Sequence, residues 1–202
     1  MIVLDSETTG LDSRKHSIVS IGAVDFENPS RKFYGECRIW AVAEITQEAL
    51  NINGFTREQV TKTNEFSQKE ILENFLDWAD PIKDRTIAGE NVGIFDLQFL
   101  KESFSREGLK YSFGHRTIEV HTASYLSHIK TGTAIPLNKN RTDISLDTTL
   151  RYVGLPPEPK PHNALTGALL ETESLYRLMH SKPLFEEYKK YDIPLYLAQE
   201  HR

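Results

Sequence analysis

The chain opens on an apolar run that carries two carboxylates and ends at a glycine turn. Residues 2–7 are Ile-Val-Leu-Asp-Ser-Glu, and Thr-Thr-Gly follows directly. In a β-strand, side chains two positions apart point to the same face, so Asp5 and Glu7 are expected side by side where a strand ends. Neighbouring acids repel each other unless a cation neutralises them, and oxygen ligands suit Mg²⁺ or Mn²⁺. The segment therefore predicts a strand with a metal site at its end; an edge strand with a solvated acidic face is the ordinary alternative.

The amino-acid composition is typical of a globular domain, and its net negative charge gives no general electrostatic attraction for polyanions. The 202 residues suffice for one α/β core, and 39% are hydrophobic. The net charge of −5 means that a nucleic-acid partner would need bound cations or a local basic patch. This argues against a sequence-specific DNA-binding protein and leaves a metal-dependent nuclease open.

The single cysteine, Cys37, excludes internal disulfides and favours a reducing compartment. The sequence has no secretory signal and no apolar run long enough to cross a membrane, and a strand that begins at residue 2 leaves no room for a cleavable leader. We therefore expect a cytoplasmic protein that does not associate with membranes.

The order of predicted elements indicates an α/β fold. Strands are predicted over residues 2–7, 17–26, 31–39 and 86–90. Helices are predicted over residues 44–50, 56–60, 67–78, 96–107, 145–153 and 164–180. Residues 117–126 mix β-branched and apolar types, 130–143 are expected to form a loop, and 156–161 are a rigid proline-rich connector. This order predicts a mixed β-sheet flanked by helices on both faces, with sites at the carboxyl ends of its strands.

We expect one domain over residues 1–180. The tail over 181–202 is too aromatic for plain disorder and is expected to pack on the same domain.

Two further segments supply an acid and a histidine at the ends of predicted elements. The run Asn91-Val92-Gly93-Ile94-Phe95-Asp96 places Asp96 after the short strand and at the start of a helix. The run His162-Asn163-Ala164-Leu165 places His162 just before the longest helix. Taken alone, Asp96 would be an ordinary acid favoured by the helix dipole, and His162 an ordinary surface histidine.

Taken with the opening segment, these runs resemble the three motifs of the DEDDh 3′→5′ exonucleases, a family that includes the proofreading subunit of bacterial DNA polymerase III. The family pattern is D-x-E-T-T-G-L-D, then (H)N-x-x-F-D, then H-x-A-L-x-D-A, and the resemblance extends to about residue 180. It implies an RNase H-like fold and a hydrolase that acts at the 3′ end of DNA or RNA, with a single strand expected. The implied products are nucleoside monophosphates, and the implied cofactors are two Mg²⁺ or Mn²⁺ ions.

The resemblance also implies roles for individual residues. Asp5 would bridge both ions, Glu7 would hold the ion on the nucleophile side, Asp96 would hold the ion on the leaving-group side, and His162 would be the general base. The backbone of Thr8, Thr9 and Gly10, together with Leu11, would line the 3′-terminal nucleotide, and Leu11 would wedge against the terminal base. Asn91 would lie beside the substrate, although Glu90 stands where the family usually has a histidine.

The pattern departs from the family at Gly167, where the last metal-binding aspartate is expected. Glu171 lies one turn farther along the predicted helix, rotated about 40° from Gly167, and falls on its apolar stripe. Glu173 is rotated by about 240° and is expected to face elsewhere. Three explanations fit: Glu171 replaces the aspartate as a ligand, the chain is a catalytically impaired module that binds nucleic acid, or the glycine was introduced to trap substrate. We favour the first, because the other four motif residues are present. An RNase H-like endonuclease is a weaker alternative.

Overall fold

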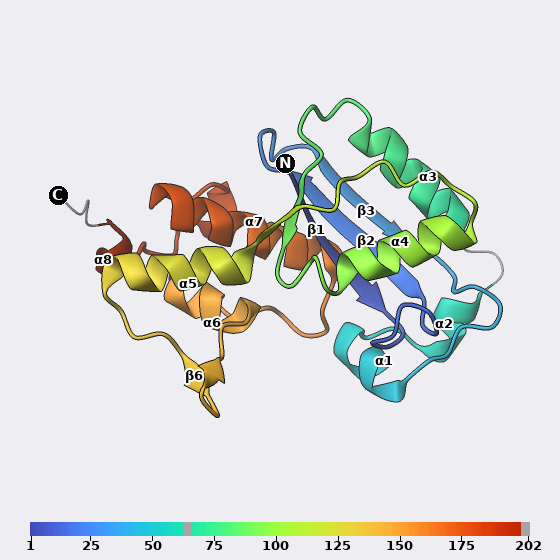
Figure 1. The fold of residues 1–202 in the computed structure, drawn as a ribbon, viewed down its shortest axis with the longest axis horizontal. Coiled ribbons are helices and arrows are strands. Elements are labelled where there is room, and N and C mark those ends of the chain that lie inside the picture. Colours follow the sequence, from blue (N-terminus) through green and yellow to red (C-terminus); the bar gives the residue numbers. More distant parts are fainter. Residues whose placement is uncertain (63–65, 199–202) are drawn as a thin grey trace.

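The computed structural model describes residues 1–62 and 66–198, and a five-stranded mixed sheet forms its centre (Figure 1). The sheet order is β3-β2-β1-β4-β5. The strands are β1 (Ile2–Thr8), β2 (Ile18–Asp25), β3 (Lys32–Glu36), β4 (Ile87–Gly89) and β5 (Thr117–Glu119). Strand β2 pairs antiparallel with β1 and β3, whereas β1–β4 and β4–β5 are parallel pairs. The predicted mixed sheet is confirmed.

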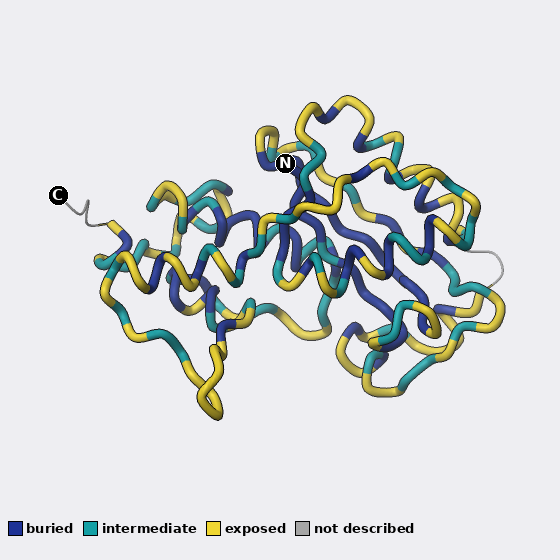
Figure 2. The backbone as a smooth tube through the Cα atoms, viewed as in Figure 1, coloured by how far each residue is buried: buried dark blue, intermediate teal, exposed yellow. Residues whose placement is uncertain are grey.

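Helices cover both faces of this sheet, as predicted. They are α1 (Gln47–Asn53), α2 (Arg57–Thr61), α3 (Gln68–Ala79), α4 (Asp96–Arg106), α5 (Val120–Thr131), α6 (Leu146–Tyr152), α7 (Ala164–His180) and α8 (Leu195–Ala198). Alternation along β1 divides the core: Ile2 and Leu4 belong to the cluster shared with α3 and α4, whereas Val3 packs with Leu175 of α7. In Figure 2 the strands form the continuous buried centre of the molecule.

Cap residues decide where the first helix lies. Prediction placed it over residues 44–50, but α1 begins after Thr46, whose hydroxyl accepts a hydrogen bond from the Ala49 backbone N–H. It ends at Gly54, which adopts a left-handed conformation with φ of 75°. The helix is therefore shifted by about one turn toward the carboxyl terminus.

The segment predicted as a loop over 130–143 contains more structure than expected. Helix α5 continues to Thr131, and the strands β6 (Leu137–Asn138) and β7 (Arg141–Thr142) form a small hairpin. Its turn residues, Lys139 and Asn140, both have positive φ, which is the geometry of tight hairpin turns. The predicted strand over 31–39 is shorter than expected and ends at residue 36.

The tail packs against α7 and α6 through its aromatic residues. Tyr188, Tyr191 and Tyr196 join a cluster with Leu150 and Leu170. The residues 199–202 of the expected tail lie outside the described part of the chain. None of the helices in the described ranges is long and apolar enough to cross a membrane.

Candidate active site

Asp5 and Glu7 lie on the side of β1 that faces α7. A Cβ atom added to Gly167 would lie 2.1 Å from Asp5 Oδ2, so the glycine provides the space that this carboxylate occupies. Burial raises the pKa of Asp5 well above its ordinary value, and nearby charges raise it further, in the order Asp96, Glu7, Glu158. Burial also raises the pKa of Glu7 to about 7, with Glu158 as the largest charge effect.

Asp96 reaches the cluster from the first turn of α4, on the opposite side of β1. Its Oδ1 accepts a hydrogen bond of 2.6 Å from the hydroxyl of Ser6, whose side chain alternates with those of Asp5 and Glu7 along the strand. Asp96 is 3% exposed. Burial raises its pKa to about 7, although the bond from Ser6 lowers it.

Glu171 is buried on α7, one turn beyond Gly167. Its Oε1 accepts a hydrogen bond of 3.1 Å from the Glu90 backbone N–H, while its buried Oε2 has no hydrogen-bond partner within the described residues. Burial raises the pKa of Glu171 well above its ordinary value, and the charge of Asp5 is the next largest cause. Glu173 faces the tail instead, where it pairs with Arg177 at 2.7 Å.

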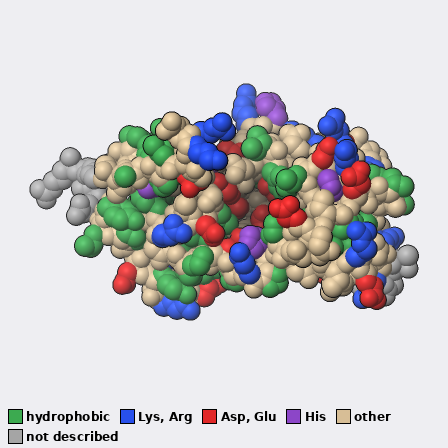
Figure 3. Space-filling model, turned by 90° about the horizontal axis from the view of Figure 1, so that it is seen from below, with side chains coloured by type: hydrophobic (Ala, Val, Ile, Leu, Met, Phe, Trp, Pro, Cys, Tyr) green, Lys and Arg blue, Asp and Glu red, His purple; other side chains and the backbone are tan. Residues whose placement is uncertain are grey.

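A pocket of about 480 Å³ is lined by two of these acids, Asp5 and Glu7. Figure 3 shows acidic side chains gathered in a hollow near the middle of one face, with a histidine at its edge. The polar residues that line the pocket include Asp5, Ser6, Glu7, Glu158 and His162. Its apolar lining residues are Leu11, Ala49, Ile52, Phe95 and Leu146. Such a pocket accommodates an apolar, planar group beside an acidic site.

Only some of the residues expected to line the 3′-terminal nucleotide lie at the pocket. Thr8, Gly10 and Leu11 line the pocket, with Leu11 85% exposed at its rim. Thr9 is fully buried and donates its hydroxyl hydrogen to the Glu44 carbonyl, so its side chain points into the protein. Asn91 is exposed and does not line the pocket.

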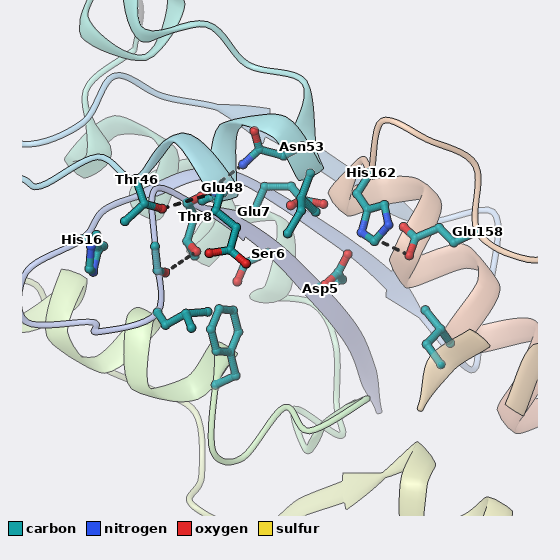
Figure 4. A pocket seen from close by; sticks show the side chains of 16 residues that line it. Asp5, Ser6, Glu7, Thr8, His16, Thr46, Glu48, Asn53, Glu158 and His162 are labelled. Atoms are coloured by element: carbon teal, nitrogen blue, oxygen red, sulfur yellow. Dashed lines mark hydrogen bonds and ion pairs between the residues drawn. The ribbon is translucent and has the colours of Figure 1, made fainter. Parts of the chain in front are cut away.

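Glu158 is a site residue that the sequence analysis missed. Its Oε2 lies 3.5 Å from His162 Nδ1, and its side chain is 8% exposed (Figure 4). Burial raises the pKa of Glu158 to about 7, and burial lowers the pKa of His162. The only sequence signal was the place of Glu158 within the proline-rich connector, four residues before His162.

The acidic cluster fits a divalent cation by donor type and charge. Asp5, Glu7, Asp96 and Glu171 offer only oxygen ligands, and Glu171 Oε2 lacks a partner among the described residues. The neighbouring acids raise one another's pKa, which is the penalty that a bound cation would remove. No three His, Cys, Asp or Glu side chains in the described ranges are already arranged to hold an ion.

Comparison of the sequence with known protein families shows to which family the chain belongs. Residues 2–170 match the RNase_T exonuclease family over most of the chain. The chain belongs to this exonuclease family. The matched residues include Asp5, Glu7, Asp96 and His162.

Two curated relatives from bacteria match half of the chain. The "DNA polymerase III subunit epsilon" of Buchnera aphidicola subsp. Schizaphis graminum is 32% identical over 113 residues, which are 52% of this chain and 45% of that protein. The "DNA polymerase III PolC-type" of Thermotoga maritima is 34% identical over 100 residues, which are 50% of this chain and 7% of that protein. The match thus spans less than half of either relative's length.

Solved structures share the fold at low sequence identity. The nuclease domain of 3′hExo, described as a DEDDh family member bound to rAMP, aligns with a TM-score of 0.67 and 16% identity, covering 96% of this chain and 94% of that one. Exonuclease I of E. coli in complex with an oligonucleotide aligns with a TM-score of 0.65 and 15% identity, covering 89% and 40%. These alignments establish the RNase H-like fold.

Proposed function

We propose that the chain is a metal-dependent 3′→5′ exonuclease that hydrolyses phosphodiester bonds of DNA or RNA and releases nucleoside monophosphates. The observation that carries the proposal is the convergence of Asp5, Glu7 and His162 on one pocket, with Asp96 and Glu171 buried behind it. An acidic pocket repels a phosphodiester unless cations bind first, so the same residues argue for metal dependence.

Asp5, Glu7, Asp96 and Glu171 would hold the Mg²⁺ or Mn²⁺ ions. When bound, two such ions would stabilise the entering and leaving oxygens of the displacement. Glu171 takes the role of the missing family aspartate in this proposal. Two features support it: Glu171 Oε2 has no hydrogen-bond partner among the residues that the structure describes, and the Asp5 carboxylate occupies the space beside Gly167.

His162 would be the general base for the attacking water. It lines the pocket, and burial lowers the pKa of its imidazole, which keeps the ring neutral at neutral pH. A neutral imidazole can accept a proton from water.

Apolar residues that line the pocket would hold the terminal base. Leu11, Ile52 and Phe95 line it close to the backbone of Thr8 and Gly10, a position suited to a single-stranded 3′ end. A cytoplasmic, reducing setting is part of the proposal, since the chain has a single cysteine, Cys37, and therefore no internal disulfide.

The test is digestion of a 5′-labelled single strand with Mg²⁺ or Mn²⁺. We expect a ladder that shortens by single nucleotides, and a kcat reduced about 10²–10⁴-fold in His162→Ala through loss of the base. Asp5→Asn and Glu171→Gln are expected to reduce the rate and to weaken Mn²⁺ binding, measured by electron paramagnetic resonance. Glu187→Gln, an exposed change of equal charge, is the control. An intact strand with both ions, or internal cleavage alone, would contradict the proposal.

A further inference from the structure

The contact between Glu158 and His162 is one that the proposed chemistry has not used. The carboxylate Oε2 and the imidazole Nδ1 are 3.5 Å apart, and the two side chains share one wall of the pocket. In the view of Figure 4, His162 lies between Glu7 on one side and Glu158 on the other. Glu158 thus contacts the imidazole through its Nδ1 atom.

The backbone around Glu158 is held from both ends. The Glu158 N–H donates to Asp147 Oδ1 at 3.4 Å, which ties the connector to α6. The His162 N–H donates to the Ile52 carbonyl at 2.9 Å, which ties it to α1. Pro161 packs so closely on Gly54 that an added Cβ there would lie 2.6 Å from the proline Cβ. Prolines on both sides of Glu158 restrict the backbone further.

Glu158 is a costly residue to keep at this place. It is a further carboxylate in an already acidic pocket, and its charge raises the pKa of both Asp5 and Glu7. Its Oε1 is buried and has no hydrogen-bond partner in the described part of the chain. A buried acid that destabilises its neighbours needs a compensating role, and its one ionic partner among the described residues is His162.

An imidazole has two nitrogens, and a carboxylate on one of them fixes both the ring orientation and the tautomer. With the hydrogen on Nδ1 directed at Glu158, Nε2 is left with its lone pair. We propose that Glu158 is a positioning residue, which holds His162 through Nδ1 so that Nε2 accepts the proton of the attacking water.

This proposal rests on the proposed function for its chemistry. Nε2 takes one proton from the water, the water oxygen forms a bond to phosphorus, and the bond from phosphorus to the leaving 3′ oxygen breaks. The leaving oxygen takes a proton from solvent, and His162 later returns its own to solvent. The carboxylate of Glu158 touches none of the reacting atoms.

A double-mutant cycle tests the dependence of Glu158 on His162. We expect Glu158→Gln to reduce kcat about 10–100-fold with KM changed less than about twofold, as for other residues that orient a catalytic group. Glu158→Asp should recover part of the loss. In a His162→Ala background, Glu158→Gln should have no further effect, because the ring that it orients is gone. An equal loss in both backgrounds would overturn the proposal, and Glu187→Gln again controls for charge.

Two measurements on the protein itself separate this idea from its alternatives. Nitrogen-15 NMR of the metal-free protein should report a His162 tautomer with the hydrogen on Nδ1, changed in Glu158→Gln and unchanged in Glu187→Gln. An identical His162 signature in Glu158→Gln would refute positioning, even if the enzyme is active. The number of Mn²⁺ ions bound should be equal in wild type and Glu158→Gln; a lost ion would instead make Glu158 a metal ligand. An inactive wild type with the expected NMR result would count against the exonuclease proposal alone.

Discussion

Gly167 is the residue at which this chain departs most clearly from the family motif, and its missing side chain has a specific consequence. A Cβ atom at position 167 would lie only 2.1 Å from Asp5 Oδ2, which is too close for both atoms to stay in place. An aspartate placed here would have to displace Asp5 before it contributed a ligand. In the proposed site, Glu171 therefore supplies the carboxylate of α7 from one turn farther along the helix than position 167.

We expect Gly167→Ala to separate stability from activity. The clash is with the end of a side chain, so Asp5 can rotate away, and alanine favours a helix interior by about 1 kcal/mol over glycine. The melting temperature should stay the same or rise, while kcat falls at least about tenfold because Asp5 is displaced. Calorimetry and the strand-digestion assay measure the two effects. Wild-type kcat in this variant would show that Asp5 does not act from its present position.

Local signals were enough to select Asp5, Glu7, Asp96 and His162 as candidates, because each stands near the boundary of a predicted element within a family-like motif. Glu158 was out of reach for a physical reason. Its contact with His162 depends on how the connector is bound between α1 and α6, and no sequence periodicity describes that path.

At the scale of elements, α7 carries two buried acids that face different parts of the molecule. Glu171 faces Asp5 on the sheet side, whereas Glu173 faces the tail. Glu173 pairs with Arg177 and accepts hydrogen bonds from the backbone N–H groups of Leu184 and Phe185. Arg177 is fully buried and donates to carbonyls before and within the tail, those of Val153, Tyr188 and Tyr191. This pair links α7 to the segment that follows it.

We predict that Arg177→Met lowers the free energy of unfolding by about 3–5 kcal/mol, because it leaves Glu173 charged and buried without its partner. Urea unfolding at neutral pH measures the loss. The double variant Glu173→Leu with Arg177→Met should regain part of it, since both charges are then absent. A loss below about 1 kcal/mol in Arg177→Met would mean that water reaches Glu173.

Most helices and strands could be predicted from the sequence. The errors lie where tertiary contacts or turn residues set the ends of an element. The periodicity of α3 and α7 placed both helices within one residue of their observed bounds. The position of α1 was missed because Thr46 and Gly54, rather than the apolar pattern, set its ends. Only part of the face of α7 that meets β1 could be predicted. The apolar stripe through Ala168 and Leu175 indicated which face of the helix is buried, but the close approach of Gly167 to Asp5 arises from tertiary packing.

At the scale of the whole molecule, the acidic cluster couples stability to pH and to cations. Asp5, Glu7, Asp96 and Glu171 all have pKa values raised by burial, so the folded state retains protons that the unfolded state releases above about pH 4. Their favourable contribution is complete below that pH and is lost as the pH rises through the folded values, about 7 for Glu7 and Asp96.

The metal-free protein should therefore melt at a lower temperature at about pH 8 than at about pH 5.5, by the sign of this linkage. Mn²⁺ should raise the melting temperature more at the higher pH, because ionised carboxylates bind the cation without first releasing protons. Asp5→Asn should flatten the pH dependence, since it removes the charge that most strongly affects Glu171, whereas Glu187→Gln should leave it unchanged. Calorimetry across this range with and without Mn²⁺ decides the matter. A melting temperature that rises with pH in the metal-free protein would show that other groups dominate, and an Mn²⁺ effect independent of pH would show that the ion binds outside the cluster.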